Sequence, residues 1–276
     1  MTFMETTRTA TSSEAAREFK PRRKGVLASL VAGTSLALMA ACTSTNPYTG
    51  EEQLALYDEA QLAEASAQAW AELKASTPTI ESGAQYQRVM RVWNRVAAAT
   101  PKAGEAWEVA VFDSEEVNAF VMPGNRVGVY RGLLELVEND DQLAAVLGHE
   151  VAHAIYRHAN QRASRAAIAS GAAQVGGAVI SGGTDGAVSA EQVAALGSVA
   201  GNLGVVLPYS RSAELEADLA GVDYMHAAGF DAQQAVRLWQ LMEANGGART
   251  AAFLSTHPDP ATRRQRIQDY INSKGY

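Results

Sequence analysis

The sequence predicts an α+β fold that is mostly helical, with a small β-sheet and one long central helix. Helical composition or spacing recurs in six segments, which are 54–76, 86–99, 132–138, 212–228, 231–244 and 260–273. Three short runs rich in β-branched and aromatic residues, at 107–112, 119–122 and 126–130, predict the sheet. A Pro-Gly-Asn turn at 123–125 separates the last two runs and predicts a hairpin.

The long central helix is predicted over 141–161. Asn139 is a typical N-cap residue, and Asp140 and Asp141 place negative charge where the helix begins. One side of this helix carries an apolar stripe, formed by Leu143, Val146, Leu147 and Val151. The helix is therefore expected to pack against the core.

Composition limits the class of protein. The chain has 276 residues, of which 47% are hydrophobic and 19% charged, which suits one large domain or two small ones. Its one cysteine excludes an internal disulfide framework and a cysteine-based zinc finger. The net charge of −7 argues against a nucleic-acid partner, because binding to phosphates needs a basic surface.

The amino terminus has the pattern of a secretion signal. A basic cluster at 20–24 precedes an uncharged apolar run at 25–41, and small residues then lead to the sole cysteine, Cys42. This ending resembles the bacterial lipobox, with Met39 in place of the usual Leu. We expect a lipoprotein signal peptide over 1–41 and a lipidated amino terminus and tether over 42–53. An uncleaved signal anchor and an unlipidated secreted protein are the alternatives.

The predicted lipid anchor also implies a location. Thr43 follows Cys42, where an Asp resembles a signal for retention in the inner membrane of many bacteria. We therefore expect a periplasm-facing lipoprotein of the bacterial outer membrane. A second segment, 164–206, is rich in Ala, Gly, Ser and Val and is too interrupted for a membrane span. A lid, a membrane-skimming segment and simple packing all fit it, with packing the expected role.

The sequence His149-Glu150-Val151-Ala152-His153 predicts a metal site on the central helix. Four helical residues place the two imidazoles roughly 40° apart and one turn along, so both can bind one Zn²⁺. Glu150 then points away from the metal ligands but stays near the remaining zinc position, where it can act as a general base. The small residues Gly148 and Ala152 are expected to leave room for the metal.

The alternative is a surface helix with incidental histidines, and His158 on the same helix is taken as such a case. A third zinc ligand is predicted downstream, at Glu214. Asp218 lies four residues later on the same helical face and is expected to accept the outer N–H of a ligand histidine. Glu216 is expected to point to the opposite side, into solvent.

Four motifs together resemble the zinc metallopeptidases of the HtpX-like and CAAX-prenyl-protease-like type, the gluzincins of peptidase family M48. In the family's order they are NAFVMPGNRVGVYRGLL at 118–134, HEVAH at 149–153, ELEAD at 214–218 and STHPDPATR at 255–263. The resemblance covers 54–276. In addition, NPYTGEEQL at 46–54 is similar to the start of the family's outer-membrane lipoprotein branch, which includes LoiP and has BepA as a soluble periplasmic relative.

The resemblance implies a zincin-like metallopeptidase domain over 54–276 that holds one Zn²⁺ per chain. It implies His149, His153 and Glu214 as zinc ligands, Glu150 as the general base and Asp218 as the support of a ligand histidine. The implied reaction is peptide hydrolysis by a zinc-activated water, with Glu150 taking its proton and passing it to the leaving amine.

Two further catalytic residues come from the last motif. His257 would either occupy the open zinc position and block the water, or donate a hydrogen bond to the oxyanion. Arg263 would pair with the same developing charge or form a structural salt bridge. The chain departs from the family's pattern at Asn125, where Gly is more frequent, and at Arg264, where an apolar residue is more usual.

The strand at 126–130 is expected to be an edge strand to which an extended substrate adds. Its residues are Arg126, Val127, Gly128, Val129 and Tyr130. Recognition through main-chain hydrogen bonds would select unfolded segments rather than particular side chains.

The resemblance implies an endopeptidase of the cell envelope that cleaves misfolded or misassembled outer-membrane proteins, near the outer-membrane assembly machinery. One alternative is a chaperone or assembly factor that uses the same cleft with a latent or self-blocked zinc site. The other is a purely structural lipoprotein.

Overall fold

The computed structural model describes residues 43–169, 209–245, 250–257 and 260–276. The predicted signal peptide, Cys42 and all but the first residues of the Gly/Ala-rich segment 164–206 lie outside the described residues, so the predictions made for them stay predictions. Within the described ranges, no helix has the length and hydropathy of a membrane span.

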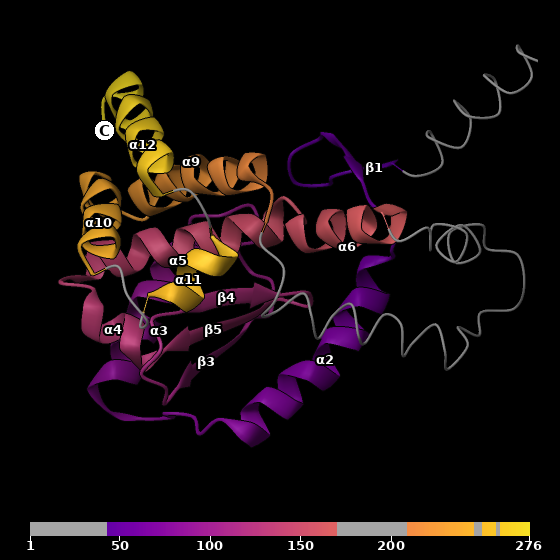
Figure 1. Cartoon of the computed structure of the whole chain (residues 1–276), viewed down its shortest axis with the longest axis horizontal. Coiled ribbons are helices and arrows are strands. Elements are labelled where there is room, and N and C mark those ends of the chain that lie inside the picture. The colour runs from indigo at the N-terminus through magenta and orange to yellow at the C-terminus, as the bar shows by residue number, and fades with distance from the viewer. Residues whose placement is uncertain (1–42, 170–208, 246–249, 258–259) are drawn as a thin grey trace, which may run out of the picture. The chain divides into compact units, whose positions relative to one another are not determined.

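The described part is mostly helical with small sheets, as predicted (Figure 1). Its helices are α2 (Glu59–Ser76), α3 (Gly83–Ala98), α4 (Arg131–Leu136), α5 (Asp140–Ile155), α6 (His158–Ala169), α9 (Arg211–Ala227), α10 (Gln233–Ala244), α11 (Ala251–Thr256) and α12 (Pro260–Lys274). The short helix α11 was not predicted from the sequence, because its six residues are too few to show a helical period.

The predicted sheet consists of β3 (Glu108–Phe112), β4 (Ala119–Met122) and β5 (Arg126–Tyr130). β5 pairs in parallel with β3 and antiparallel with β4, so the strand order is β3-β5-β4. The prediction that β5 is an edge strand is wrong. Its backbone groups are bonded to neighbours on both sides, and β4 is an edge of this sheet instead.

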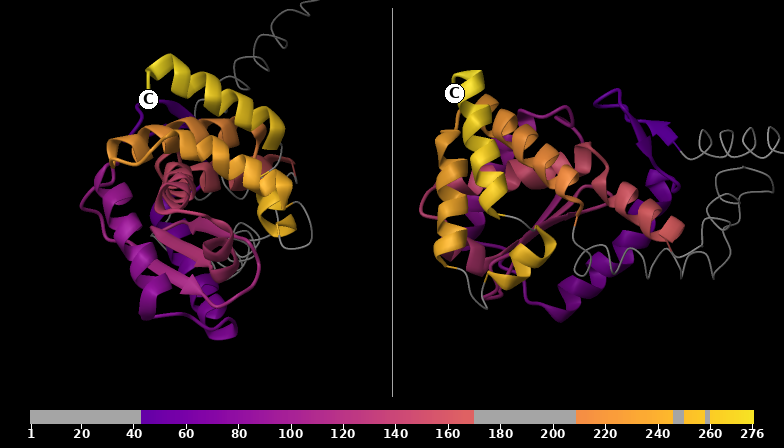
Figure 2. Two further views of the ribbon diagram at one scale, coloured as in Figure 1. Left: turned by 90° about the vertical axis from the view of Figure 1, so that its left-hand side faces the viewer. Right: turned by 45° about the horizontal axis from the view of Figure 1, so that its top comes forward.

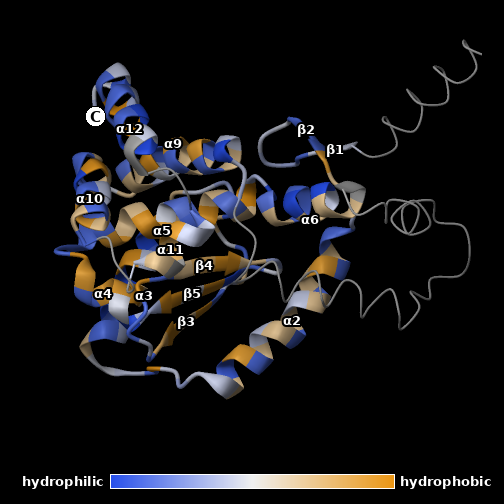
Figure 3. Ribbon diagram, in the orientation of Figure 1, coloured by the Kyte–Doolittle hydropathy of each residue, from blue (hydrophilic) through white to orange (hydrophobic). Residues whose placement is uncertain are grey.

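The two faces of the sheet are covered by different helices. Residues alternate along each strand, so that Val111, Val121 and Val129 join the main core while their neighbours face the other way. On that other face, Trp70 of α2 packs edge to face on Phe112, with ring centroids 5.6 Å apart. Figure 3 shows the strands as predominantly apolar, whereas α12 is largely hydrophilic.

Helix α5 lies between the sheet and α9, as the left view of Figure 2 shows. It begins as predicted, since the side chain of Asn139 accepts a hydrogen bond from the backbone N–H of Gln142 at 2.9 Å. Its predicted end at residue 161 is wrong. The helix stops at Ile155, and Arg157 takes a left-handed backbone conformation with φ 54° before α6 begins.

The carboxyl end of α5 is held by the segment predicted as a tether. This segment forms an antiparallel hairpin of β1 (Thr43–Thr45) and β2 (Glu52–Leu54). From it, Asn46 Nδ2 donates to the backbone oxygen of Ile155 at 2.7 Å, and Gln53 Nε2 donates to that of Tyr156 at 2.9 Å. These bonds satisfy carbonyl groups that a helix end leaves without a partner inside the helix.

The hairpin is also fixed to the loop before the sheet. The Tyr48 hydroxyl donates to Glu105, which also accepts from Lys102 Nζ at 2.7 Å and from Asn125 Nδ2 at 2.8 Å. Asn125 has a φ of 59°, a left-handed conformation that glycine adopts most easily and that asparagine tolerates. Burial would raise the pKa of Glu105, but these hydrogen bonds lower it to about 2.

We expect Glu105→Gln to lower the free energy of unfolding by about 1 kcal/mol at pH 7, a modest loss because the carboxylate is partly exposed. The folded-state pKa lies below the ordinary value of 4.5, so the carboxylate stabilises the fold above that pH and ceases to do so as the pH falls toward 2. Urea unfolding at pH 7, 4 and 3 should therefore show the wild-type and variant curves converging. The exposed Glu64→Gln is the control, and a difference independent of pH would contradict the prediction.

Candidate active site

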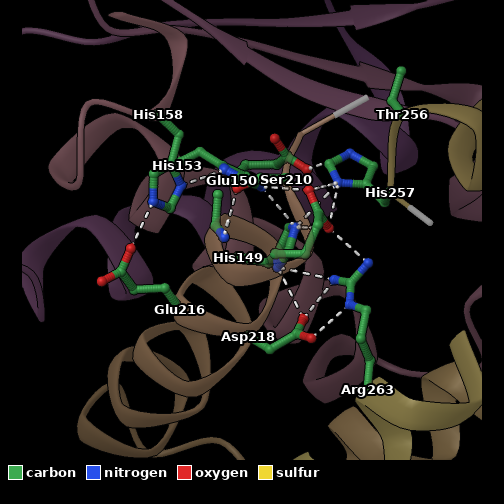
Figure 4. Close-up of polar contacts among 12 residues, drawn as sticks. His149, Glu150, His153, His158, Ser210, Glu216, Asp218, Thr256, His257 and Arg263 are labelled. Carbon is green, nitrogen blue, oxygen red and sulfur yellow. Dashed lines mark hydrogen bonds and ion pairs between the residues drawn. The ribbon is translucent and has the colours of Figure 1, made fainter. Parts of the chain in front are cut away.

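Four buried side chains converge between α5, α9 and the end of α11 (Figure 4). His149, His153, Glu214 and His257 each offer one ligand atom, and these atoms lie within 4.8 Å of one another. The Nε2 atoms of His149 and His153 are 2.9 Å apart, and Glu214 oxygens lie 3.5 and 3.4 Å from them. The structure therefore brings together the three predicted zinc ligands and adds His257.

The packing of α9 on α5 brings Glu214 to the two histidines. The helices touch backbone to backbone, because a Cβ added to Gly148 would lie 2.7 Å from the carbonyl oxygen of Gly221. Ala152 likewise packs against alanines of α9. The prediction that Gly148 and Ala152 leave room for the metal is thus wrong, since these small residues instead allow the close approach of α9.

His257 follows α11 and points into the cluster. Its Nδ1 lies 3.1 Å from both oxygens of Glu214 and 3.2 Å from Nε2 of His149. Its Nε2 lies 3.5 Å from Oε1 of Glu150. Burial lowers the pKa of His257, but Glu214 outweighs this effect and raises it overall. His257 thus belongs to the same buried group of candidate ligand atoms as His149, His153 and Glu214.

Glu150 is almost completely buried, at 1% exposure. Neither oxygen has a hydrogen-bond partner of normal geometry in the described part of the chain, although the backbone of Val121 in β4 is near enough to favour the charged form. Burial raises the pKa of Glu150 to about 7. Such a carboxylate can both accept and release a proton near neutral pH.

Asp218 and Arg263 surround the outer side of His149. The Nδ1 atom of His149 lies 3.0 Å from Oδ1 of Asp218, the contact expected from the sequence. Arg263 donates two parallel hydrogen bonds to Asp218, at 2.6 and 2.7 Å, and its Nη1 lies 2.6 Å from Glu214. Burial would raise the pKa of Asp218, but Arg263 lowers it to about 2. Arg263 thus lies in a buried salt bridge, one of the two roles considered for it.

The donor set fits zinc. Burial lowers the pKa of His149 and places that of His153 well below its ordinary value, so both imidazoles are neutral at pH 7, the form that binds a metal. Two imidazole nitrogens and one carboxylate oxygen are a typical catalytic zinc set. Glu150 lies beside this set, with Oε1 3.5 Å from Nε2 of His257, and its oxygens have no hydrogen-bond partner of normal geometry among the described residues, so a proton acceptor is available there.

Three neighbours of the site were not recognised from the sequence. His158, expected to be incidental, is buried at 1% exposure with Nδ1 2.7 Å from Nδ1 of His153. Glu216, expected in solvent, is only partly exposed and lies 2.9 Å from Nε2 of His158. The ring of Tyr209 stacks on His153 with centroids 4.0 Å apart. No sequence pattern marks these residues, because the break after α5 and the packing of α9 bring them together.

A cavity of about 300 Å³ adjoins the site. It lies along the end of β4, at Val121 and Met122, and reaches His153 on one side and α2 on another. The end of β4 and His153 therefore border one space in the described part of the structure.

The sequence of the chain matches the profile of one known protein family. The sequence profile of peptidase family M48 matches residues 83–271, which include every residue of the cluster described above.

The chain belongs to peptidase family M48.

Relatives in this family carry metallopeptidase names. The mitochondrial metalloendopeptidase OMA1 of Schizosaccharomyces pombe is 34% identical over 185 residues, covering 66% of this chain and 52% of that protein. The metalloprotease YcaL of Escherichia coli is 30% identical over 256 residues, covering 88% of this chain and 96% of YcaL. The β-barrel assembly-enhancing protease of the same bacterium is 24% identical and covers 92% of this chain and 53% of that protein.

These M48 relatives confirm the family expected from the motifs, and with it a zinc metallopeptidase domain of the α+β class. The chain spans about half the length of the OMA1 relatives. The predicted domain boundaries, the roles of the individual site residues and the lipoprotein branch stay predictions.

Proposed function

We propose that this M48 protein is a zinc endopeptidase of the bacterial cell envelope that cleaves misfolded or misassembled outer-membrane proteins. The observation that carries the proposal is the buried group of ligand atoms within 4.8 Å of one another, with Glu150 beside it. Among the described residues this buried carboxylate has no hydrogen-bond partner of normal geometry, an arrangement that is costly for stability, so its presence here favours a catalytic role over a structural one.

His149, His153 and Glu214 would hold the zinc, and their neutral imidazoles and single carboxylate leave the site with a net positive charge. When bound, zinc would supply the Lewis acidity that activates water and polarises the peptide carbonyl. Glu150 then takes a proton from the attacking water and delivers it to the leaving amine. Asp218 keeps the proton of His149 on Nδ1, so that Nε2 is free for the metal.

An extended substrate would bind along β4. This strand is an edge in the described sheet, borders the cavity beside His153 and lies next to Glu150. Main-chain pairing at a free edge recognises extended chains and tolerates varied side chains, as cleavage of misfolded proteins requires.

The proposed location rests on the sequence. The lipobox-like ending at Cys42 predicts an anchor in the outer membrane, and the hairpin that begins at Thr43 would hold the domain near it. The name of one relative, the β-barrel assembly-enhancing protease of Escherichia coli, is consistent with a role near outer-membrane assembly.

A second function is supported by His257. Because its Nδ1 is 3.2 Å from Nε2 of His149, the imidazole can take the fourth zinc position and keep the water out. A protein blocked in this way would hold unfolded outer-membrane proteins as a chaperone and would cleave them only after His257 moves.

The test uses the full chain, purified in mild detergent from a bacterial host. We expect about one zinc per chain and cleavage of unfolded porin or casein, with faster cleavage by His257→Ala. Zinc without cleavage in both forms would reject the endopeptidase in favour of the chaperone. For the anchor, Cys42→Ser should release the protein from the outer-membrane fraction, and an unchanged membrane fraction would reject lipidation.

A further inference from the structure

His158 is a buried histidine that the proposed mechanism does not use. Its ring lies between His153 and the carboxylate of Glu216, as Figure 4 shows. The distances are 2.7 Å from Nδ1 of His153 to Nδ1 of His158, and 2.9 Å from Nε2 of His158 to Oε2 of Glu216. Both lie in the range of good hydrogen bonds.

The positions of the nitrogen atoms determine where the protons lie. If Nε2 of His153 binds the metal, as its place among the candidate ligand atoms suggests, the proton of this ring would be on Nδ1 and would be donated to Nδ1 of His158. His158 then carries its own proton on Nε2 and donates it to Glu216. Each ring has one donor and one acceptor, and each is used once.

The arrangement parallels the one at the other ligand histidine. Asp218 accepts directly from Nδ1 of His149 at 3.0 Å, whereas Glu216 acts on His153 through one intervening ring. Glu214, Glu216 and Asp218 all come from the first turns of α9. One helix therefore supplies a candidate zinc ligand and a carboxylate for the outer side of each ligand histidine.

The break after α5 makes this contact possible. On an unbroken helix, a residue five positions after His153 would point roughly 140° away from it. The left-handed conformation of Arg157 ends the helix and turns His158 back behind His153. Asn46 and Gln53 of the hairpin satisfy the carbonyls at the break, so the turn is held from outside the helix.

We propose that His158 and Glu216 are positioning residues that fix the proton and the orientation of the zinc ligand His153. This inference rests on the proposed zinc peptidase function, because it assigns His153 to the metal. Residues that orient a ligand histidine typically change metal affinity about 10- to 100-fold when replaced.

The test measures the zinc dissociation constant of the full chain by competition with a chelator. We expect His158→Ala to weaken zinc binding about 10- to 100-fold and Glu216→Gln about 10-fold. Glu216 is partly exposed, so Glu216→Gln should fold normally, and thermal unfolding of the metal-free protein checks this. Asp223→Asn is the control, because it removes the same charge from the same helix at a site bonded to Tyr270 and Tyr276.

The double variant distinguishes an effect of Glu216 that passes through His158 from a simple effect of its charge. If Glu216 acts through His158, adding Glu216→Gln to His158→Ala should weaken zinc binding no further. Additive losses of zinc affinity in the double variant, or an unchanged affinity in Glu216→Gln, would overturn the proposal that Glu216 acts on His153 through His158. A wild-type chain that binds no zinc would instead refute the proposed function. Tight zinc binding and cleavage in both the wild type and the variants would refute only the positioning roles of His158 and Glu216.

Discussion

The Glu150→Gln variant should bind zinc like the wild type and cleave protein substrates about 10²- to 10⁴-fold more slowly. The amide keeps the shape of the side chain but cannot take a proton. Glu150 is not among the grouped ligand atoms, so the donors of the metal are unchanged. The measurement is the rate of casein cleavage by the full chain, with bound zinc quantified in the same samples.

A matched control comes from helix α2. Glu72→Gln makes the same chemical change at an exposed residue bonded only to Gln68 among the described contacts, and its cleavage rate should equal that of the wild type. Cleavage retained in Glu150→Gln would rule out the assigned base. Loss of zinc in that variant would show that Glu150 supports the metal instead.

Local sequence signals predict the start of α5 and the two strands, β4 and β5, that precede it. The bounds of β4 and β5 were found because a Pro-Gly-Asn turn separates two short apolar runs. Asn139 marked the beginning of α5 because a cap bonds to residues directly after it. The zinc motif was equally local, since its two histidines are one helical turn apart.

Features that depend on contacts between distant residues leave no local signal in the sequence. Tyr156 and Arg157 include no Gly or Pro, and the carbonyl groups at the break are bonded by Asn46 and Gln53, more than one hundred residues earlier. The position of β5 in the middle of the sheet depends on its parallel pairing with β3, for which no turn between them gives a signal. His158 was misjudged as a direct result, because an unbroken helix would have turned it away from His153.

Arg263→Ala should lower the free energy of unfolding of the metal-free protein by about 3 to 5 kcal/mol, because it leaves two buried carboxylates without their cation. Arg263 is 3% exposed, bonds to Asp218 through two nitrogens and lies over the ring of Trp239 at 4.1 Å. Urea unfolding in the presence of a chelator measures the loss.

The neighbouring Arg264 provides the comparison. It lies 3.4 Å from Glu243 with both side chains partly exposed, so Arg264→Ala should cost less than about 1 kcal/mol. Zinc supplies positive charge beside Glu214, and the Arg263→Ala loss should therefore shrink when the metal is present. Equal losses in the two arginine variants would contradict a stabilising salt bridge. A large loss that zinc does not reduce would mean that the two carboxylates need the guanidinium hydrogen bonds themselves, and not merely a nearby cation.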